Sequence, residues 1–191
     1  MPSLELEGSQ IEVAEDMKIL GVIISSDMKF SKNTQYITNK AYKRIWMIKR
    51  LKNLGASVSQ MLEVYFKQVR SILELAVPVW QSSLTISDKI KIERVQKCAL
   101  RIIYGQDYLS YSSACKMSNL LSLEERRIQL CKKFALKALK SEKHSKWFKV
   151  NERASITRQK VPVFQPVMSR TTRFYNSPIS YLTSLLNQTF K

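Results

Sequence analysis

The chain has 191 residues, of which 45% are apolar, so it can bury a core of ordinary size and is expected to fold. Its 32 Lys and Arg residues against 15 Asp and Glu residues give a formal charge of +17, an imbalance that favours a polyanionic partner, above all nucleic acid. Four glycines and five prolines are few for a turn-rich β-sandwich, and a mainly helical protein is predicted.

Some classes of site are excluded by spacing. The three cysteines, Cys98, Cys115 and Cys131, lie far apart and the only histidine is His144, so no zinc site is expected and reduced thiols are predicted. The longest apolar run, Ile19 to Ile24, is too short to cross a bilayer. An intracellular protein without membrane contact is therefore predicted.

The first 27 residues predict short strands. Leu4 to Glu7 and Ile11 to Val13 alternate in polarity, and Lys18 to Ile24 is rich in β-branched residues. Two or three such strands form a sheet that is marginal alone, since a hairpin needs another layer over its apolar face. The expected architecture is a helical bundle preceded by a small N-terminal β-hairpin or a three-stranded remnant of a sheet.

Helical patterns follow along most of the chain. Gly55 is placed to end a first helix, Lys29 to Leu54, and Ser57 with Gln60 forms a capping box that opens a second. The second box, Ser122 with Glu125, opens a long basic helix. The expected helices after the first are Ser57 to Ala76, Ser87 to Tyr104 with Gly105 at its end, Ser112 to Met117, and Leu123 to about Ser141. The stretch Asn151 to Arg173 is expected to be an extended or partly disordered arm, followed by one or two helical turns within Ser180 to Leu186.

Stand-alone catalysis is not predicted. Metal-dependent phosphoryl transfer needs clustered carboxylates, and no two of the four aspartates, Asp16, Asp27, Asp88 and Asp107, are adjacent. A nucleophile elbow and a phosphate-binding glycine loop are also missing from the sequence. No catalytic, metal or cofactor residue is assigned.

Basic residues interleaved with aromatic ones are the strongest functional signal. Residues 28 to 62 contain no acidic residue. On the first helix a basic-aromatic face opposite Ile37, Ala41, Ile45 and Ile48 is predicted to hold phosphates and bases. The candidate nucleic-acid-binding residues are Tyr36, Lys40, Lys43, Arg44, Trp46, Arg50, Arg94, Lys97 and Arg101. A second cluster, in which a solvated face is an equally open reading, comprises Arg126, Arg127, Lys132, Lys133, Lys137, Lys140, Lys143 and Lys146.

Blocks of sequence over nearly the whole chain resemble the region downstream of the catalytic aspartates in non-LTR (LINE-type, jockey-like) retrotransposon reverse transcriptases. They include Lys18-Ile-Leu-Gly-Val-Ile-Ile-Ser25, Arg70-Ser-Ile-Leu-Glu-Leu-Ala-Val-Pro-Val-Trp80, Ile92-Glu-Arg-Val-Gln-Lys-Cys-Ala-Leu-Arg-Ile-Ile-Tyr-Gly105 and Arg170-Thr-Thr-Arg-Phe-Tyr-Asn-Ser-Pro-Ile-Ser-Tyr-Leu-Thr183. The blocks follow the family's order and approximate spacing.

The resemblance implies a division of the chain and a role for each part. Residues 1–27 would be the end of the polymerase palm with a primer-grip-like hairpin at Leu20 and Gly21, and 28–80 the helical hairpin of the thumb. Residues 81–148 would be a basic C-terminal extension, and 149–191 a basic arm with a short terminal helix. The partners implied are RNA and DNA, as an RNA–DNA hybrid, together with the palm and fingers missing from this chain. Mg²⁺ is expected only in that missing palm, and the family's habit of copying at the chromosome implies the nucleus.

Three readings stay open from the sequence. The first is a nucleic-acid-binding fragment of an RNA-directed DNA polymerase that is inactive alone. The second is a partner-binding module that uses its apolar surfaces. The third is a remnant of a mobile element without polymerase activity.

Overall fold

The computed structural model describes residues 4–6, 9–11, 14–151 and 162–190, and part of the predicted arm, 152–161, lies outside them. The strands are β1 (Leu4–Leu6), β2 (Ser9–Ile11), β3 (Asp16–Ile19) and β4 (Val22–Ser25). The helices are α1 (Ser31–Asn53), α2 (Val58–Val64), the π-helical η1 (Tyr65–Arg70), α3 (Ser71–Leu73), α4 (Val77–Trp80), η2 (Gln81–Ser83), α5 (Ile86–Tyr104), η3 (Gly105–Asp107), α6 (Tyr111–Met117), α7 (Leu123–Leu139), α8 (Glu142–Ser145), α9 (Thr172–Tyr175) and α10 (Pro178–Thr189). The predicted fold class, mainly helical with a small N-terminal β-hairpin, is confirmed.

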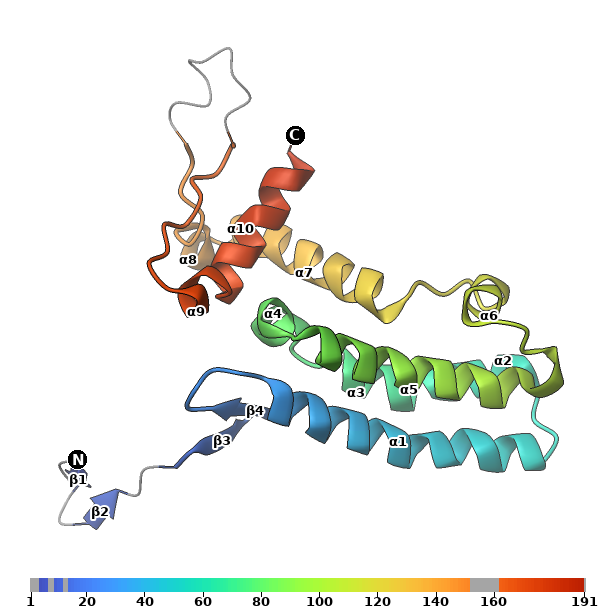
Figure 1. Cartoon of the computed structure of the whole chain (residues 1–191). Helices are drawn as coiled ribbons and strands as arrows, with labels where there is room; N and C mark the ends of the chain where they lie inside the picture. Colours follow the sequence, from blue (N-terminus) through green and yellow to red (C-terminus); the bar gives the residue numbers. More distant parts are fainter. Residues whose placement is uncertain (1–3, 7–8, 12–13, 152–161, 191) are drawn as a thin grey trace.

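The strands form two separate antiparallel hairpins, β1–β2 and β3–β4 (Figure 1). The run Lys18 to Ile24 is a hairpin and not one continuous strand, because Leu20 and Gly21 both have positive φ and reverse the chain between the paired residues Ile19 and Val22. Hairpin β3–β4 is anchored to the bundle: Val22 is buried, and the amide of Ile23 donates to Asn33 Oδ1 (3.1 Å) on α1.

The helices stack in layers, with α1 along one side, η1, α3 and α5 in the middle, and α7 with α10 on the other side (Figure 1). Ile37, Ala41, Ile45 and Ile48 of α1 are buried, as the sequence predicts. The buried residues facing them from the middle layer include Tyr65, Val69, Ile92, Val95 and Ala99. One continuous core crosses the expected boundary between residues 80 and 81.

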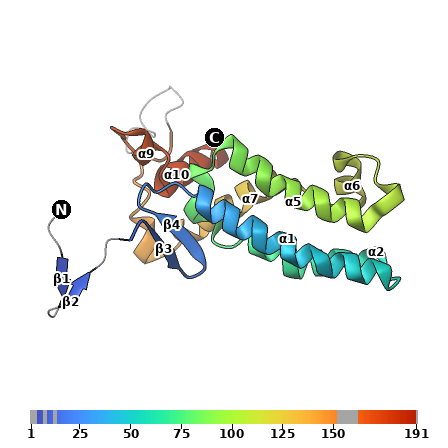
Figure 2. The ribbon, with the colours of Figure 1, turned by 60° about the horizontal axis from the view of Figure 1, so that its bottom comes forward.

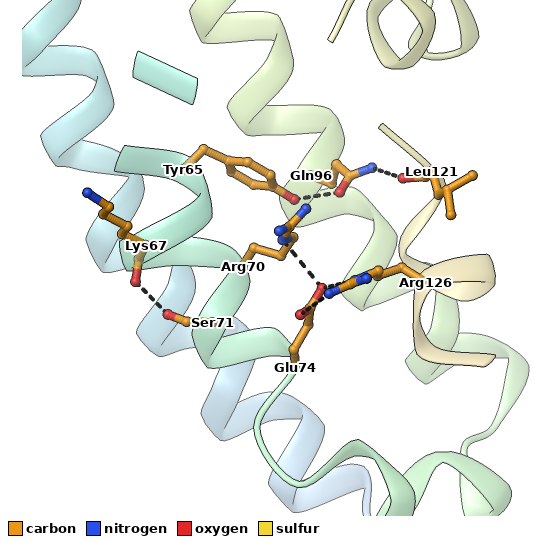
Figure 3. Close-up of polar contacts among 8 residues, drawn as sticks. All are labelled: Tyr65, Lys67, Arg70, Ser71, Glu74, Gln96, Leu121 and Arg126. Atoms are coloured by element: carbon orange, nitrogen blue, oxygen red, sulfur yellow. Dashed lines mark hydrogen bonds and ion pairs between the residues drawn. The ribbon is translucent and has the colours of Figure 1, made fainter. Parts of the chain in front are cut away.

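The second predicted helix is not a uniform α-helix. Its buried residues recur every four positions, at Met61, Tyr65, Val69, Leu73 and Val77. On an α-helix of 3.6 residues per turn this spacing drifts by about 40° per step, and the wider turns of a π-helix cancel the drift. Segment η1 therefore keeps this stripe on the core, and Ser71 Oγ donates to the Lys67 carbonyl (2.7 Å) where the helix changes type (Figure 3).

Buried Gln96 of α5 ties the middle layer to the chain beyond it. Its Oε1 accepts from the Tyr65 hydroxyl (2.5 Å), and its Nε2 donates to the Tyr111 hydroxyl (2.8 Å) and to the Leu121 carbonyl (3.0 Å). Figure 3 shows Tyr65 and Leu121 meeting at this amide from opposite sides. The network fixes η1, α6 and the start of α7 against one side of α5.

Helices α1 and α5 run parallel, and polar contacts join their first turns to each other and their last turns to each other. At the start, Ser31 Oγ donates to Asp88 Oδ2 (2.8 Å), and Asp88 also accepts from Thr85 Oγ1 (2.7 Å). At the other end, Lys52 Nζ donates to the Ile102 carbonyl (2.5 Å), one of the last carbonyls of α5. A cation suits the negative end of the helix dipole. Gly105 leaves space for the Lys52 ammonium group, because a Cβ at position 105 would lie 2.4 Å from Lys52 Nζ.

We predict that Lys52→Met lowers the free energy of unfolding by about 1–2 kcal/mol, because the carbonyls at the end of α5 lose a charged donor. The matched control is Lys49→Met, an exposed lysine one turn earlier on α1, which should change stability by less than about 0.5 kcal/mol. Urea unfolding followed by circular dichroism measures both. Equal values for the two variants would contradict the capping role of Lys52.

Candidate nucleic-acid interface

The solvent-facing side of α1 carries a dense row of cations. Helix α5 and the segment η1–α3 cover the other sides of α1. The exposed basic residues on it that form no ion pair with any described acidic residue are Lys40, Lys43, Arg44, Lys49 and Arg50. Lys32, at the start of the helix, is different, because its Nζ lies 2.5 Å from Asp16 Oδ2. That contact lowers the pKa of Asp16 and raises that of Lys32.

Trp46 is the exposed aromatic residue at the centre of this face. Its side chain is 58% exposed, which is unusual for an indole without a binding partner. The guanidinium of Arg50 lies 5.3 Å from the Trp46 ring centroid, within cation–π range. The pair presents an aromatic ring and a cation together, as base-stacking and phosphate-binding surfaces do.

Tyr36, another predicted contact residue, is half-buried and held by the hairpin. Lys18 Nζ of β3 donates to the Tyr36 hydroxyl (2.8 Å) and lies 4.5 Å from its ring centroid. The hydrogen bond from Lys18 lowers the pKa of the phenol. Tyr36 therefore links β3–β4 to α1, and any ligand contact it makes is shared with Lys18.

Helix α5 extends the basic surface. Arg94, Lys97 and Arg101 are exposed and form no ion pair with a described acidic residue. Lys97 Nζ lies 5.1 Å from the Tyr111 ring centroid and the Arg101 guanidinium 5.4 Å from that of Tyr108. These two tyrosines were not singled out from the sequence. They come from the turn after Gly105, and only the chain reversal there places them beside α5.

Helices α1 and α5 share a border, where Arg94 of α5 lies near Tyr42 of α1. Figure 2 shows α1 and α5 side by side along their length. Tyr42 marks the border: burial chiefly raises the pKa of its phenol, Cys98 raises it further, and nearby Arg94 lowers it. Arg94 of α5 thus lies next to α1, although some fifty residues separate the two helices in the sequence. Lys40 lies on the other flank of α1, where it lines a pocket with Ser71 and Ile72.

The tip of hairpin β3–β4 is apolar and strained. Leu20 has φ +47° and is 93% exposed. Gly21 follows with φ +87°, and a Cβ there would lie 3.2 Å from Leu75 Cδ2. The left-handed conformation costs a leucine roughly 1–2 kcal/mol. Gly21 lines a small pocket together with Tyr36 and Lys40 of α1, so the structure brings these predicted residues together, whereas Leu20 is not part of that pocket.

Only part of the second predicted basic cluster is accessible to a ligand. Arg127 is fully buried: its Nε donates to Gln81 Oε1 (2.8 Å), and burial lowers the pKa of its guanidinium. Arg126 is paired with Glu74 (3.0 Å), which Arg70 also approaches at 3.4 Å (Figure 3). The expectation that these two arginines meet a ligand is therefore corrected, and the exposed members are Lys133, Lys137, Lys140, Lys143 and Lys146. Phe134 on the same helix is 40% exposed.

The described residues offer no arrangement for metal chemistry. They contain no group of three His, Cys, Asp or Glu side chains that could hold a metal ion. Asp16 is paired with Lys32, and Asp88 is buried in the first turn of α5, where its carboxylate accepts from Ser31 and Thr85. The Mg²⁺ that the family resemblance implies does not fit these carboxylates, and no step of phosphoryl transfer is assigned to them. Across the described helices, none combines the length and apolar character needed to span a bilayer.

Comparison of the chain with protein-family models, curated proteins and solved structures gave no match.

We predict that Leu20→Asn raises the free energy of unfolding by about 0.5–1 kcal/mol. Asn tolerates the left-handed conformation, and Asn-Gly is the preferred pair for a two-residue hairpin loop of this kind. Because Val22 is buried in the core, the hairpin unfolds together with the helices, and the gain appears in the free energy of global unfolding. Thermal and urea unfolding provide the measurement. A loss of stability would mean that the Leu20 side chain stabilises the hairpin more than its backbone strains it.

Proposed function

We propose that this chain grips the sugar-phosphate backbone of an RNA–DNA hybrid, as the thumb and C-terminal connecting region of a non-LTR retrotransposon reverse transcriptase. The observation that carries the proposal is the set of exposed cations on α1 and α5 that lack acidic partners among the described residues. They lie beside aromatic rings, which are the exposed Trp46 and the half-buried Tyr108 and Tyr111. Such a set of cations repels itself in water and is stabilised by a polyanion.

The length and chemistry of the surface favour a duplex backbone over base reading. A 23-residue helix is about 35 Å long, so α1 can follow several successive phosphates. Lys and Arg side chains on phosphates give affinity without sequence preference. The A-form shape of a hybrid, with its shallow minor groove, is recognised by such backbone contacts.

Each part of the chain has a role in this proposal. Residues 1–27 belong to the end of the polymerase palm, with Leu20 and Gly21 as a primer-grip-like tip, and 28–80 to the thumb. Residues 81–148 extend the grip through Arg94, Lys97 and Arg101, and 149–191 form the C-terminal arm. The catalytic aspartates with their Mg²⁺, and the fingers, belong to partner segments of the polymerase. This chain positions nucleic acid and does not polymerise alone.

A partner-binding module is the second candidate, and the exposed β3 strand favours it. All four residues of β3 are exposed, Met17 and Ile19 among them at 58% and 46%, and the apolar Leu20 follows directly. Exposed apolar edge strands invite pairing with another chain. Under the first proposal the missing palm covers this edge, whereas under the second an unrelated partner covers it and nucleic acid binds weakly.

We predict that the triple variant Lys43→Glu, Arg44→Glu, Arg50→Glu loses most of its affinity for an RNA–DNA hybrid. Removal of three phosphate contacts should also lower the slope of log affinity against log salt by about three. Fluorescence anisotropy with a labelled hybrid over a salt series measures affinity and slope together.

The matched control reverses three exposed lysines on the other side of the molecule, Lys137→Glu, Lys140→Glu and Lys143→Glu. The net charge changes by the same amount, so a loss confined to the α1 variant assigns binding to the α1–α5 surface. Equal losses of affinity in both variants would mean that binding depends on the net charge of the protein and not on the α1–α5 surface. Weak binding by wild type and both variants would favour the partner-binding module.

A further inference from the structure

A cavity lies at the C-terminal end of the described part of the chain, away from the basic surface. Its volume is about 420 Å³, within the range of roughly 300–1,000 Å³ typical of small-ligand sites. Helix α10 forms the floor, α9 and the following residue form one wall, and the segment from Pro162 to Val167 forms the other. Ser82 of η2 closes one end.

The walls are held by specific bonds. The Asn187 side chain of α10 accepts from the Phe164 amide (2.8 Å) and donates to the Phe164 carbonyl (3.0 Å), which fixes the 162–167 wall. Ser83 Oγ donates to the Asn176 carbonyl (3.3 Å), which fixes the α9 wall to η2. Phe164 also packs edge-on against Phe148 and Phe190. The cavity is thus part of the fold and has defined sides.

The lining is neutral, although the chain carries 32 Lys and Arg residues. It combines rings and prolines with amides and hydroxyls, among them Ser82, Pro166, Tyr175, Asn176, Tyr181 and Gln188. A phosphate would find no cation among these side chains. A neutral, planar group with both donors and acceptors would find stacking and hydrogen-bonding partners.

One polar group in the lining is left without a partner. The Ser82 hydroxyl is shielded from solvent and forms no hydrogen bond in the described part of the chain. A buried hydroxyl of this kind costs free energy until a ligand or a water bonds to it. Tyr175, by contrast, is 66% exposed at the rim, where its ring is free to cover an entering group.

We propose that this cavity takes an unpaired nucleobase. Tyr175 stacks on the base, and the amides of Asn176 and Gln188 bond to its edge, as in proteins that read single-stranded nucleic acid by stacking and edge contacts. The proposal rests on the proposed function for its source of bases, a strand that leaves the hybrid held by α1 and α5. It adds a second kind of contact, to bases outside a duplex.

The test uses free nucleosides, which carry no phosphate and therefore do not depend on the basic surface. Uridine and adenosine are titrated into the full-length, isotope-labelled chain, and amide shifts are followed by NMR. The expected result is saturable shifts at the side-chain amides of Asn176 and Gln188. Tyr175→Ala should weaken the affinity about fivefold to a hundredfold, from the stacking contribution of one base.

The matched control is Phe174→Ala, which removes the neighbouring, half-exposed ring that does not line the cavity. It should bind nucleosides as wild type does, and so should the triple Glu variant of α1. The base pocket would be overturned if nucleosides caused no shifts, or if the Tyr175 and Phe174 variants bound them with equal affinity. It would also be overturned if a proline-rich peptide caused the shifts and nucleosides did not. The hybrid-binding proposal would stand or fall separately, on the salt series.

Discussion

The parallel packing of α1 on α5 is the contact on which the rest of the structure depends. Ser31 with Asp88 sets one end and Lys52 with the last carbonyls of α5 sets the other. Between these ends, small and β-branched residues such as Ala41, Val95 and Ala99 allow close approach. Because the helices are fixed in register, Arg94 of α5 is held beside Tyr42 of α1.

Charge sets the second constraint. A chain with a net charge of +17 must direct most of its cations toward water, and the few acids are used where the core needs them. Glu74 holds Arg126 and Arg70 between the layers, and Asp88 joins the start of α5 to Ser31 of α1. Among the described residues, Lys32 is the one cation on the outer side of α1 with such an acidic partner, Asp16, so the repulsion among the other cations remains for a polyanion to relieve.

Local signals in the sequence predicted much of the fold. The capping boxes at Ser57 and Ser122 and the glycine at the end of α5 depend on neighbouring residues only, and the structure confirms them. The helical face of α1 with Lys43, Trp46 and Arg50 was also predictable, since 3.6-residue periodicity defines it. These residues supply most of the candidate site on α1.

Other features depend on contacts distant in the sequence. The buried stripe from Met61 to Val77 fits an α-helix poorly, and its exact four-residue spacing was the available signal for η1. Arg127 follows Arg126 in the sequence, so no local signal distinguishes the buried arginine from its neighbour. Arg127 is buried because α4 and α10 cover α7. Tyr108 and Tyr111 join the basic surface through a chain reversal, and the neutral cavity exists only once α10 meets the 162–167 segment.

The most direct test is lysine acetylation of the chain with and without an RNA–DNA hybrid, read residue by residue by mass spectrometry. The proposed grip predicts that the hybrid protects Lys40, Lys43, Lys49 and Lys97, while Lys137 and Lys140 of α7 and its C-cap are acetylated as in the free protein. Protection of the α7 lysines with α1 unchanged, or no protection at all, would contradict the account.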